Sequence, residues 1–126
     1  MAAPYIILLA HGSRDPQWKV PFERLHEQLS ARHENVALAY WELTEPSLEQ
    51  IVASVQAQGV THCKVLPLFF SQGKHLREDL PAQIESLEQR HGLTLELLPP
   101  VGEHPSFAGF MELLISELIS KEVAVP

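Results

Sequence analysis

The chain has 126 residues, of which 45% are hydrophobic, enough for the core of one domain of ordinary size. Its formal net charge is −7 with only nine Lys and Arg residues, which excludes the broad positive cluster that a nucleic-acid-binding surface needs. The sequence contains no internal repeat and no Pro/Gly/Ser-rich linker. We therefore expect a single domain over residues 1–126 that does not bind nucleic acid.

The apolar runs and the cysteine content indicate the compartment. No apolar run approaches the roughly 20 residues that span a bilayer. No basic region precedes the apolar run at residues 5–10, which argues against a signal peptide. The single cysteine, Cys63, cannot form an internal disulfide and has no Cys or His partner at metal-site spacing. We expect a cytoplasmic protein with no membrane partner, in which Cys63 is a buried structural thiol.

The first half of the chain predicts two strand-then-helix units. Residues 5–10 form a continuous apolar run, as in a strand that is covered on both faces. Apolar residues at helical spacing predict a helix over 20–32, and residues 36–41 are predicted as the second strand. Pro46 is expected in the first turn of a second helix, and Gly59 is expected to end it.

The second half predicts two more such units. The third strand is expected over 64–70, with a bulge or a strand end at Pro67, which lacks a donor for the sheet. Helices are expected over 79–90 and 106–120, with the fourth strand at 94–98 between them. Strands that alternate with helices imply an α/β fold, with a parallel sheet of about four strands and helices on both faces.

Ligands of such sheets bind beyond the carboxyl ends of the strands, where two histidines stand out. His11 follows the first strand directly, and Gly12 after it lets the backbone turn. His75 lies in a connection that spans nine residues between Phe70 and Leu80, longer than the typical connection of about 2–6 residues. Taken alone, His11 could equally cap the strand, and His75 could be a solvated loop residue.

Glu42 follows the second strand, so three consecutive strands each deliver a His or Glu to the same edge. Two imidazoles and a carboxylate suit Fe, Co, Ni or Zn better than Mg or Ca. His104, after the fourth strand, is interpreted as the flank of the last helix, although it could line the same cleft. The remaining histidines are expected to be surface or hydrogen-bonded residues: His26, His33, His62 and His91.

Basic residues gather in the loops at the same edge of this acidic chain. Arg14 and Lys19 lie in the first loop, and Lys74 and Arg77 lie in the third. Such a distribution favours a polyanionic small ligand, to which helix N-termini would add hydrogen-bond donors. The alternative is that these cations are simply scattered and solvated.

Three segments resemble a known family. Residues 9–16 (LAHGSRDP), 41–47 (WELTEPS) and 66–75 (LPLFFSQGKH) are similar to the short CbiX type of class II chelatase. The resemblance extends from about Tyr5 to Leu118. It implies a flavodoxin-like chelatase half that inserts Co²⁺, Fe²⁺ or Ni²⁺ into sirohydrochlorin, a modified tetrapyrrole, for cobalamin or sirohaem synthesis.

The resemblance also implies roles for individual residues. The two histidines of the family site correspond to His11 and His75, and its metal-proximal glutamate corresponds to Glu42. We expect these three residues to bind the metal and to accept the pyrrole protons, without a division of roles between the histidines. The carboxylates of the substrate are expected to contact Ser13, Arg14, Lys74 and Arg77.

Larger relatives carry two such halves in one chain, which face each other across the cleft. A chain with one half therefore suggests a homodimer with a composite cleft. No organic cofactor is implied, because the metal is a substrate and the loops lack a glycine-rich phosphate cradle.

Other functions remain open from the sequence. A non-catalytic divalent-metal carrier could use the same His and Glu residues. A histidine-nucleophile phosphatase is disfavoured, because Ala10 stands where such sites place arginine before the histidine. A small α/β interaction module could use the charged loops to bind a protein. The sequence does not decide between metals or between pathways.

Overall fold

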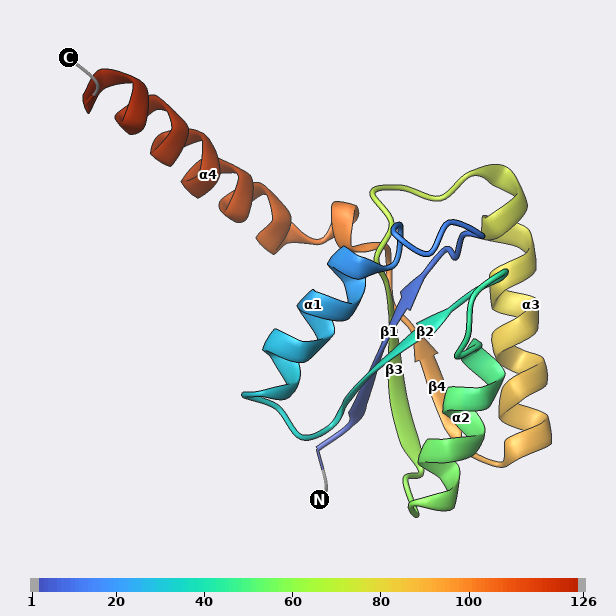
Figure 1. The fold of residues 1–126 in the computed structure, drawn as a ribbon. Helices are drawn as coiled ribbons and strands as arrows, with labels where there is room; N and C mark the ends of the chain where they lie inside the picture. The colour runs from blue at the N-terminus through green and yellow to red at the C-terminus, as the bar shows by residue number, and fades with distance from the viewer. Residues whose placement is uncertain (1–2, 125–126) are drawn as a thin grey trace.

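The computed structural model describes residues 3–124 and contains a four-stranded parallel sheet with the strand order β2-β1-β3-β4 (Figure 1). The strands are β1 (Tyr5–Ala10), β2 (Val36–Tyr40), β3 (His62–Pro67) and β4 (Thr94–Leu97). The helices are α1 (Val20–Ser30), α2 (Leu48–Ala57), α3 (Lys74–His91) and α4 (Pro105–Ala124), and a 3₁₀ turn, η1, spans Val101–Glu103. The predicted α/β fold is confirmed.

Helices cover both faces of the sheet, with α2 and α3 on one face and α1 on the other (Figure 1). β1 lies between β2 and β3, which explains why it is a continuous apolar run. Successive side chains of a strand point to opposite faces. Ile7 and Leu9 accordingly pack in the larger core under α2 and α3, whereas Leu8 packs on the α1 side.

β3 confirms two predictions. The strand ends at Pro67, and the amide of Leu68 donates to the carbonyl of Leu9 at 2.8 Å just beyond it. Cys63 is fully buried, and burial raises the pKa of its thiol to about 11. The thiol is therefore a structural group rather than a reactive one.

The prediction for the start of α3 is wrong. The helix begins at Lys74, five residues before the predicted start, so Pro81 lies inside it and not near its first turn. Leu76 and Leu80 are both buried, one helical turn apart. Packing of these two leucines on the sheet stabilises the early turns, and it outweighs the backbone hydrogen bond that Pro81 cannot make.

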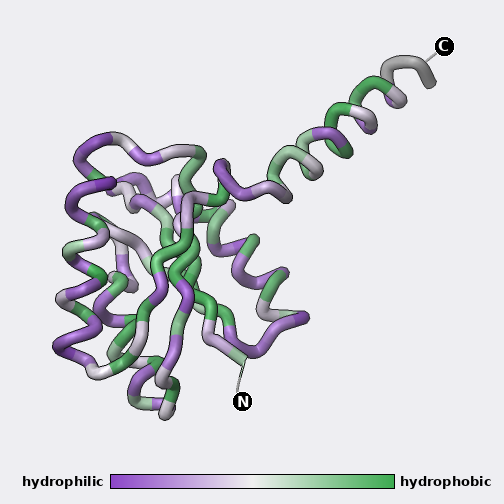
Figure 2. Tube along the Cα trace, turned by 180° about the vertical axis from the view of Figure 1, so that it is seen from behind, coloured by the Kyte–Doolittle hydropathy of each residue, from purple (hydrophilic) through white to green (hydrophobic). Residues whose placement is uncertain are grey.

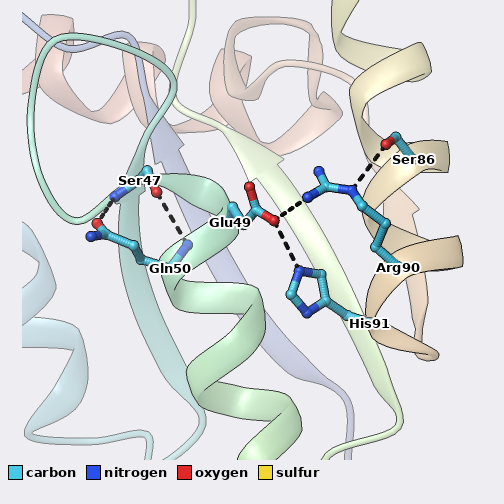
Figure 3. A network of polar contacts seen from close by, with 6 residues as sticks. All are labelled: Ser47, Glu49, Gln50, Ser86, Arg90 and His91. Atoms are coloured by element: carbon cyan, nitrogen blue, oxygen red, sulfur yellow. Dashed lines mark hydrogen bonds and ion pairs between the residues drawn. The ribbon is translucent and has the colours of Figure 1, made fainter.

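α2 also begins differently from the prediction. Pro46 lies before the helix, and Ser47 is its N-cap. The Ser47 hydroxyl accepts from the amide of Gln50 at 3.1 Å, and the Gln50 side chain accepts from the amide of Ser47 at 2.7 Å (Figure 3). This reciprocal capping box fixes the start of α2. Gly59 follows the helix with φ of 90°, which confirms its predicted role as a stop.

The last helix, α4, extends away from the rest of the domain (Figure 1). It is longer than predicted, and its apolar residues show as green segments outside the body of the molecule (Figure 2). Within residues 3–124, no helix is long and apolar enough to cross a membrane. Large apolar side chains that α4 leaves exposed are Phe110, Leu113, Ile115, Leu118 and Ile119.

Candidate functional site

At the start of the loop after β1, the backbone of Gly12 lies unusually close to the backbone of Glu42. Gly12 has φ of 106°, a conformation that residues with a side chain rarely adopt. A Cβ atom at Gly12 would lie 1.6 Å from the carbonyl oxygen of Glu42. Only glycine therefore allows the segment after β1 to contact the segment after β2 in this way.

Backbone hydrogen bonds continue this contact beyond the two strands. The amide of Trp41 donates to the carbonyl of Ala10 at 2.8 Å, and the amide of Glu42 donates to the carbonyl of His11 at 2.9 Å. These bonds extend the pairing of β1 and β2 by two residues. The backbone that carries His11 is consequently held on the sheet rather than in a free loop.

A side chain also connects the two loops. The Thr44 hydroxyl donates to the carbonyl of Ser13 at 2.8 Å and accepts from the amide of Ser13 at 2.9 Å. The Ser13 hydroxyl accepts from the amide of Asp15 at 3.1 Å. Ser13, predicted to bind substrate, thus contributes to the shape of the first loop.

The His11 ring lies on an aromatic support. It stacks on Phe69 with ring centroids 4.1 Å apart and 30° between the planes, and it meets Trp41 edge-on at 6.4 Å. Phe69 is buried, whereas His11 is exposed. The imidazole is held from below by a fixed ring, and its nitrogens remain accessible to a ligand.

His75 also lies edge-on to Trp41, with ring centroids 6.1 Å apart and 66° between the planes. The residue lies in the first turn of α3 and not in the predicted loop. Its Nε2 lies 2.9 Å from Oδ2 of Asp79, one turn further along the helix. The side chain is 81% exposed, so this carboxylate is its principal restraint. The predicted histidine pair is therefore brought to one edge of the sheet, where both rings lie edge-on to Trp41.

Glu42 is exposed at the same edge. No group of three His, Cys, Asp or Glu side chains within residues 3–124 is close enough to hold a metal ion. The arrangement places both imidazoles near Trp41 without assembling a closed set of three ligands. Metal binding by His11, His75 and Glu42 stays a prediction.

The predicted substrate-binding cations flank the histidines. Arg14 is exposed in the first loop, and Lys74 and Arg77 are exposed in the first turn of α3. Gly73 precedes that turn in an extended conformation as the N-cap of α3. The positive end of the helix dipole and two cationic side chains thus lie together beside His75.

Two histidines outside the candidate pair, His104 and His91, have structural partners. Nδ1 of His104 accepts from the amide of Ser106 at 3.0 Å, which confirms its interpretation as the flank of α4. Figure 3 shows Glu49 of α2 between Arg90 and His91 of α3. The hydrogen bond from His91, with the nearby Arg90, lowers the pKa of the Glu49 carboxyl group. This network joins the two helices outside the candidate site.

Three residues of the site were not assigned by sequence reasoning. Trp41 lies near both histidine rings, and its Nε1 donates to the Gln83 side chain at 2.8 Å. Phe69 supports His11, and Asp79 is the partner of His75. Only the last had a local signal, since His75 and Asp79 lie four apart, the spacing of one helical turn.

This geometry defines the class of the protein: it is a parallel α/β domain that presents two histidines at the carboxyl edge of its sheet. A family profile described as CbiX matches residues 5–118. The chain therefore belongs to the CbiX family.

Individual relatives agree with this assignment. The sirohydrochlorin cobaltochelatase of Saccharolobus solfataricus is 33% identical over 76 residues, which cover 60% of this chain and 59% of that protein. The crystal structure of a putative CbiX cobalamin biosynthesis protein from Marinobacter aquaeolei is 44% identical, with a TM-score of 0.86, over 94% of this chain and 99% of that one. The sirohydrochlorin chelatase SirB of Bacillus subtilis, in complex with cobalt, is 25% identical with a TM-score of 0.69, over 79% of this chain and 44% of SirB.

Proposed function

We propose that this chain is a sirohydrochlorin chelatase, a single domain over residues 1–126 that inserts a divalent metal into the tetrapyrrole. The observation that carries the proposal is the pair His11 and His75, whose rings both lie edge-on to Trp41 at the carboxyl edge of the sheet. The names of its relatives in the CbiX family support the same reaction. The alternative of a non-catalytic metal carrier is less favoured, because it gives no account of the cationic side chains beside His75.

Insertion requires that the metal lose water and that two pyrrole protons leave the macrocycle. A neutral imidazole can perform either task, since it can bind a metal through one nitrogen or accept a proton near neutral pH. When the Nε2–H group of His75 donates a hydrogen bond to Asp79, Nδ1 is the unprotonated nitrogen that is free to bind a metal or accept a proton. His11, on its Phe69 support, presents a second imidazole at a fixed position. Glu42 would add a carboxylate to the metal or collect the released protons.

The metal and its macrocycle require different contacts. Ser13, Arg14, Lys74 and Arg77 would bind the carboxylates of sirohydrochlorin, with Arg able to bind them bidentately. The names of the relatives favour Co²⁺ as the metal, and Fe²⁺ or Ni²⁺ would suit the same imidazole ligands. The metal is a substrate, and no organic cofactor enters this reaction. Cobalamin or sirohaem synthesis in the cytoplasm would use the product.

The cleft requires a second half. The chain matches less than half of SirB, which has room in one chain for two domains of this fold. A homodimer would form the corresponding composite cleft, with the histidines of each copy facing the other copy across the bound tetrapyrrole.

The test follows the absorbance of sirohydrochlorin under anaerobic conditions with Co²⁺, Fe²⁺ or Ni²⁺. We expect the wild-type protein to accelerate insertion, and His11→Ala and His75→Ala to lose about 100-fold in rate, the usual contribution of a general base. His62→Ala is the matched control, because His62 begins β3 at the opposite edge of the sheet. An uncatalysed rate with every metal would refute the enzyme, and metal binding retained by that protein would support the carrier instead.

A further inference from the structure

α4 is a long apolar helix without a surface to pack on. Its main contact within the described chain is with the short turn η1. Leu113 is 70% exposed and Ile119 is 59% exposed. Phe110, Leu114 and Leu118 are spaced four residues apart and therefore form one row along the helix. An exposed apolar surface of this length marks an interaction site.

The sheet leaves a matching surface open. A groove of about 520 Å³ lies between α1 and the strands, and it is lined by Ile6, Leu8, Leu29, Val36 and Leu66 among others. A second groove, of about 400 Å³ and almost wholly apolar, lies at the start of α4 and shares Leu66 with the first. The two grooves meet at Leu66, and we call them together the channel; the far end of the first groove is polar, with Arg32, His33, Glu34 and Asn35 in its lining.

α4 starts at this channel but turns away from it. Phe107 in its first turn packs edge-on against Phe70, with ring centroids 5.2 Å apart, and from there the helix extends outward (Figures 1 and 2). The match to the Marinobacter structure covers 94% of the chain, whereas α4 alone has 20 of the 126 residues. That match therefore includes a large part of α4.

We infer that α4 of one copy packs into the channel of a second copy, and that the second copy returns the same contact. This inference rests on the dimer of the proposed function and states how its two copies are joined. Both surfaces are present on the same chain, which is the requirement for a closed twofold interface. The occupant is a second copy because the Marinobacter chain, 99% of which matches this chain, also holds one domain of this fold, whereas the SirB match leaves room for two in one chain.

This exchange of α4 helices between the two copies also connects the dimer interface to the candidate site. Phe70, which contacts α4, is adjacent to Phe69, on which His11 stacks. An α4 that is fixed in the partner consequently restrains the segment that supports the imidazole.

Cysteine cross-linking tests this contact in the full-length protein. One chain carries Leu66→Cys in the channel, and a second, differently tagged chain carries Leu114→Cys in the middle of α4. Native Cys63 stays inert at pH 8, because burial raises its pKa to about 11. We expect mixing and mild oxidation to give the disulfide heterodimer. The matched control is Ser116→Cys, which lies off the apolar row, and we expect little cross-linking from it.

Four other outcomes would overturn the exchange of α4, and each can be distinguished from the others. A Leu114→Cys homodimer without the heterodimer would mean that α4 packs against α4. A disulfide formed only within a chain that carries both substitutions would mean that α4 folds back onto its own sheet. A dimer by light scattering without any α4 cross-link would refute the exchange and leave the proposed dimer standing. A monomer with chelatase activity would refute both the exchange and the composite cleft.

A second measurement needs no cross-link. Leu118 is 55% exposed in the single chain, so Leu118→Asp should leave the unfolding of an isolated copy nearly unchanged. If α4 is exchanged, two Leu118 side chains lose burial in each dimer, and the dissociation constant should rise about 100-fold or more. Ser116→Asp should change it less than about threefold. Equal dissociation constants for Leu118→Asp, Ser116→Asp and the wild type, measured by sedimentation, would refute the exchange.

Discussion

His11 and His75 both lie edge-on to Trp41, yet the chain holds them in very different ways. The His11 backbone is bonded to Glu42, and its ring lies on buried Phe69. The His75 ring is 81% exposed on the first turn of α3, and Asp79 holds it through one contact.

The difference shows which contacts hold each histidine of the site in place. The His11 side depends on contacts between segments that follow two neighbouring strands, so it is as rigid as the sheet. The His75 side depends on one turn of a helix and can change its rotamer at little cost. In the proposed chelatase reaction, a fixed imidazole and an adjustable one would suit a metal ion that is first bound and then transferred to the tetrapyrrole. Four substitutions test this contrast, taken from the largest expected change in stability to the smallest.

Gly12→Ala should be the most damaging. The new Cβ would overlap the carbonyl oxygen of Glu42 at a positive φ, so the two loops must separate. We expect a loss of about 3 kcal/mol in the free energy of unfolding, from backbone strain and broken hydrogen bonds. Gly73→Ala is the matched control on the His75 side, because its Cβ would contact nothing within 4 Å. It should lose no more than about 1 kcal/mol, the size of an N-cap effect. Equal losses in urea unfolding would contradict the contrast.

Phe69→Leu should come next. Leucine keeps an apolar side chain in the core and removes the ring on which His11 stacks. We expect a loss of about 1.5 kcal/mol in stability, together with slower metal insertion. Phe70→Leu is the control, since Phe70 is 73% exposed, and it should change stability by less than about 0.5 kcal/mol. An unchanged insertion rate in Phe69→Leu would show that the stack does not position His11.

Thr44→Val should have a smaller effect. Valine matches the shape of threonine but leaves the amide and the carbonyl of Ser13 without their partner. The expected loss in the free energy of unfolding is about 1 kcal/mol, the net contribution of such hydrogen bonds. Thr94→Val, at an exposed strand position, should be neutral or slightly stabilising. Thermal unfolding of both variants would distinguish a loss of the loop connection from a general effect of valine.

Asp79→Asn should barely change stability, by less than about 0.5 kcal/mol, because an exposed ion pair contributes little. Its effect should appear in function instead. Without the carboxylate, His75 loses its orientation, and the affinity for Co²⁺ should fall about 10-fold. Calorimetric titration with Co²⁺ would measure this, with Glu78→Gln as the neighbouring control. A fall of the same size in the control would mean that only the local charge matters.

Much of this site could be predicted from the sequence, for a definite reason. His11 and Gly12 follow a continuous apolar strand, and the carboxyl ends of parallel strands meet at one edge. The pattern of strands therefore placed the first and third loops together. The sequence did not predict the first turns of α3, because Pro81 suggests that the helix starts near it. The evidence for an earlier start is the burial of Leu76, and that burial is a tertiary contact.

The sequence by itself determined the parallel sheet, the end of β3 at Pro67 and the edge that carries the two histidines. Each of these follows from local periodicity or from the missing donor of proline, which neighbouring residues reveal. Only the tertiary structure decided that both histidines lie edge-on to Trp41, that Phe69 supports His11, and that α4 leaves its own sheet uncovered. These features depend on packing between segments that are far apart in the chain. The spacing of residues along the sequence does not predict which of these segments come into contact.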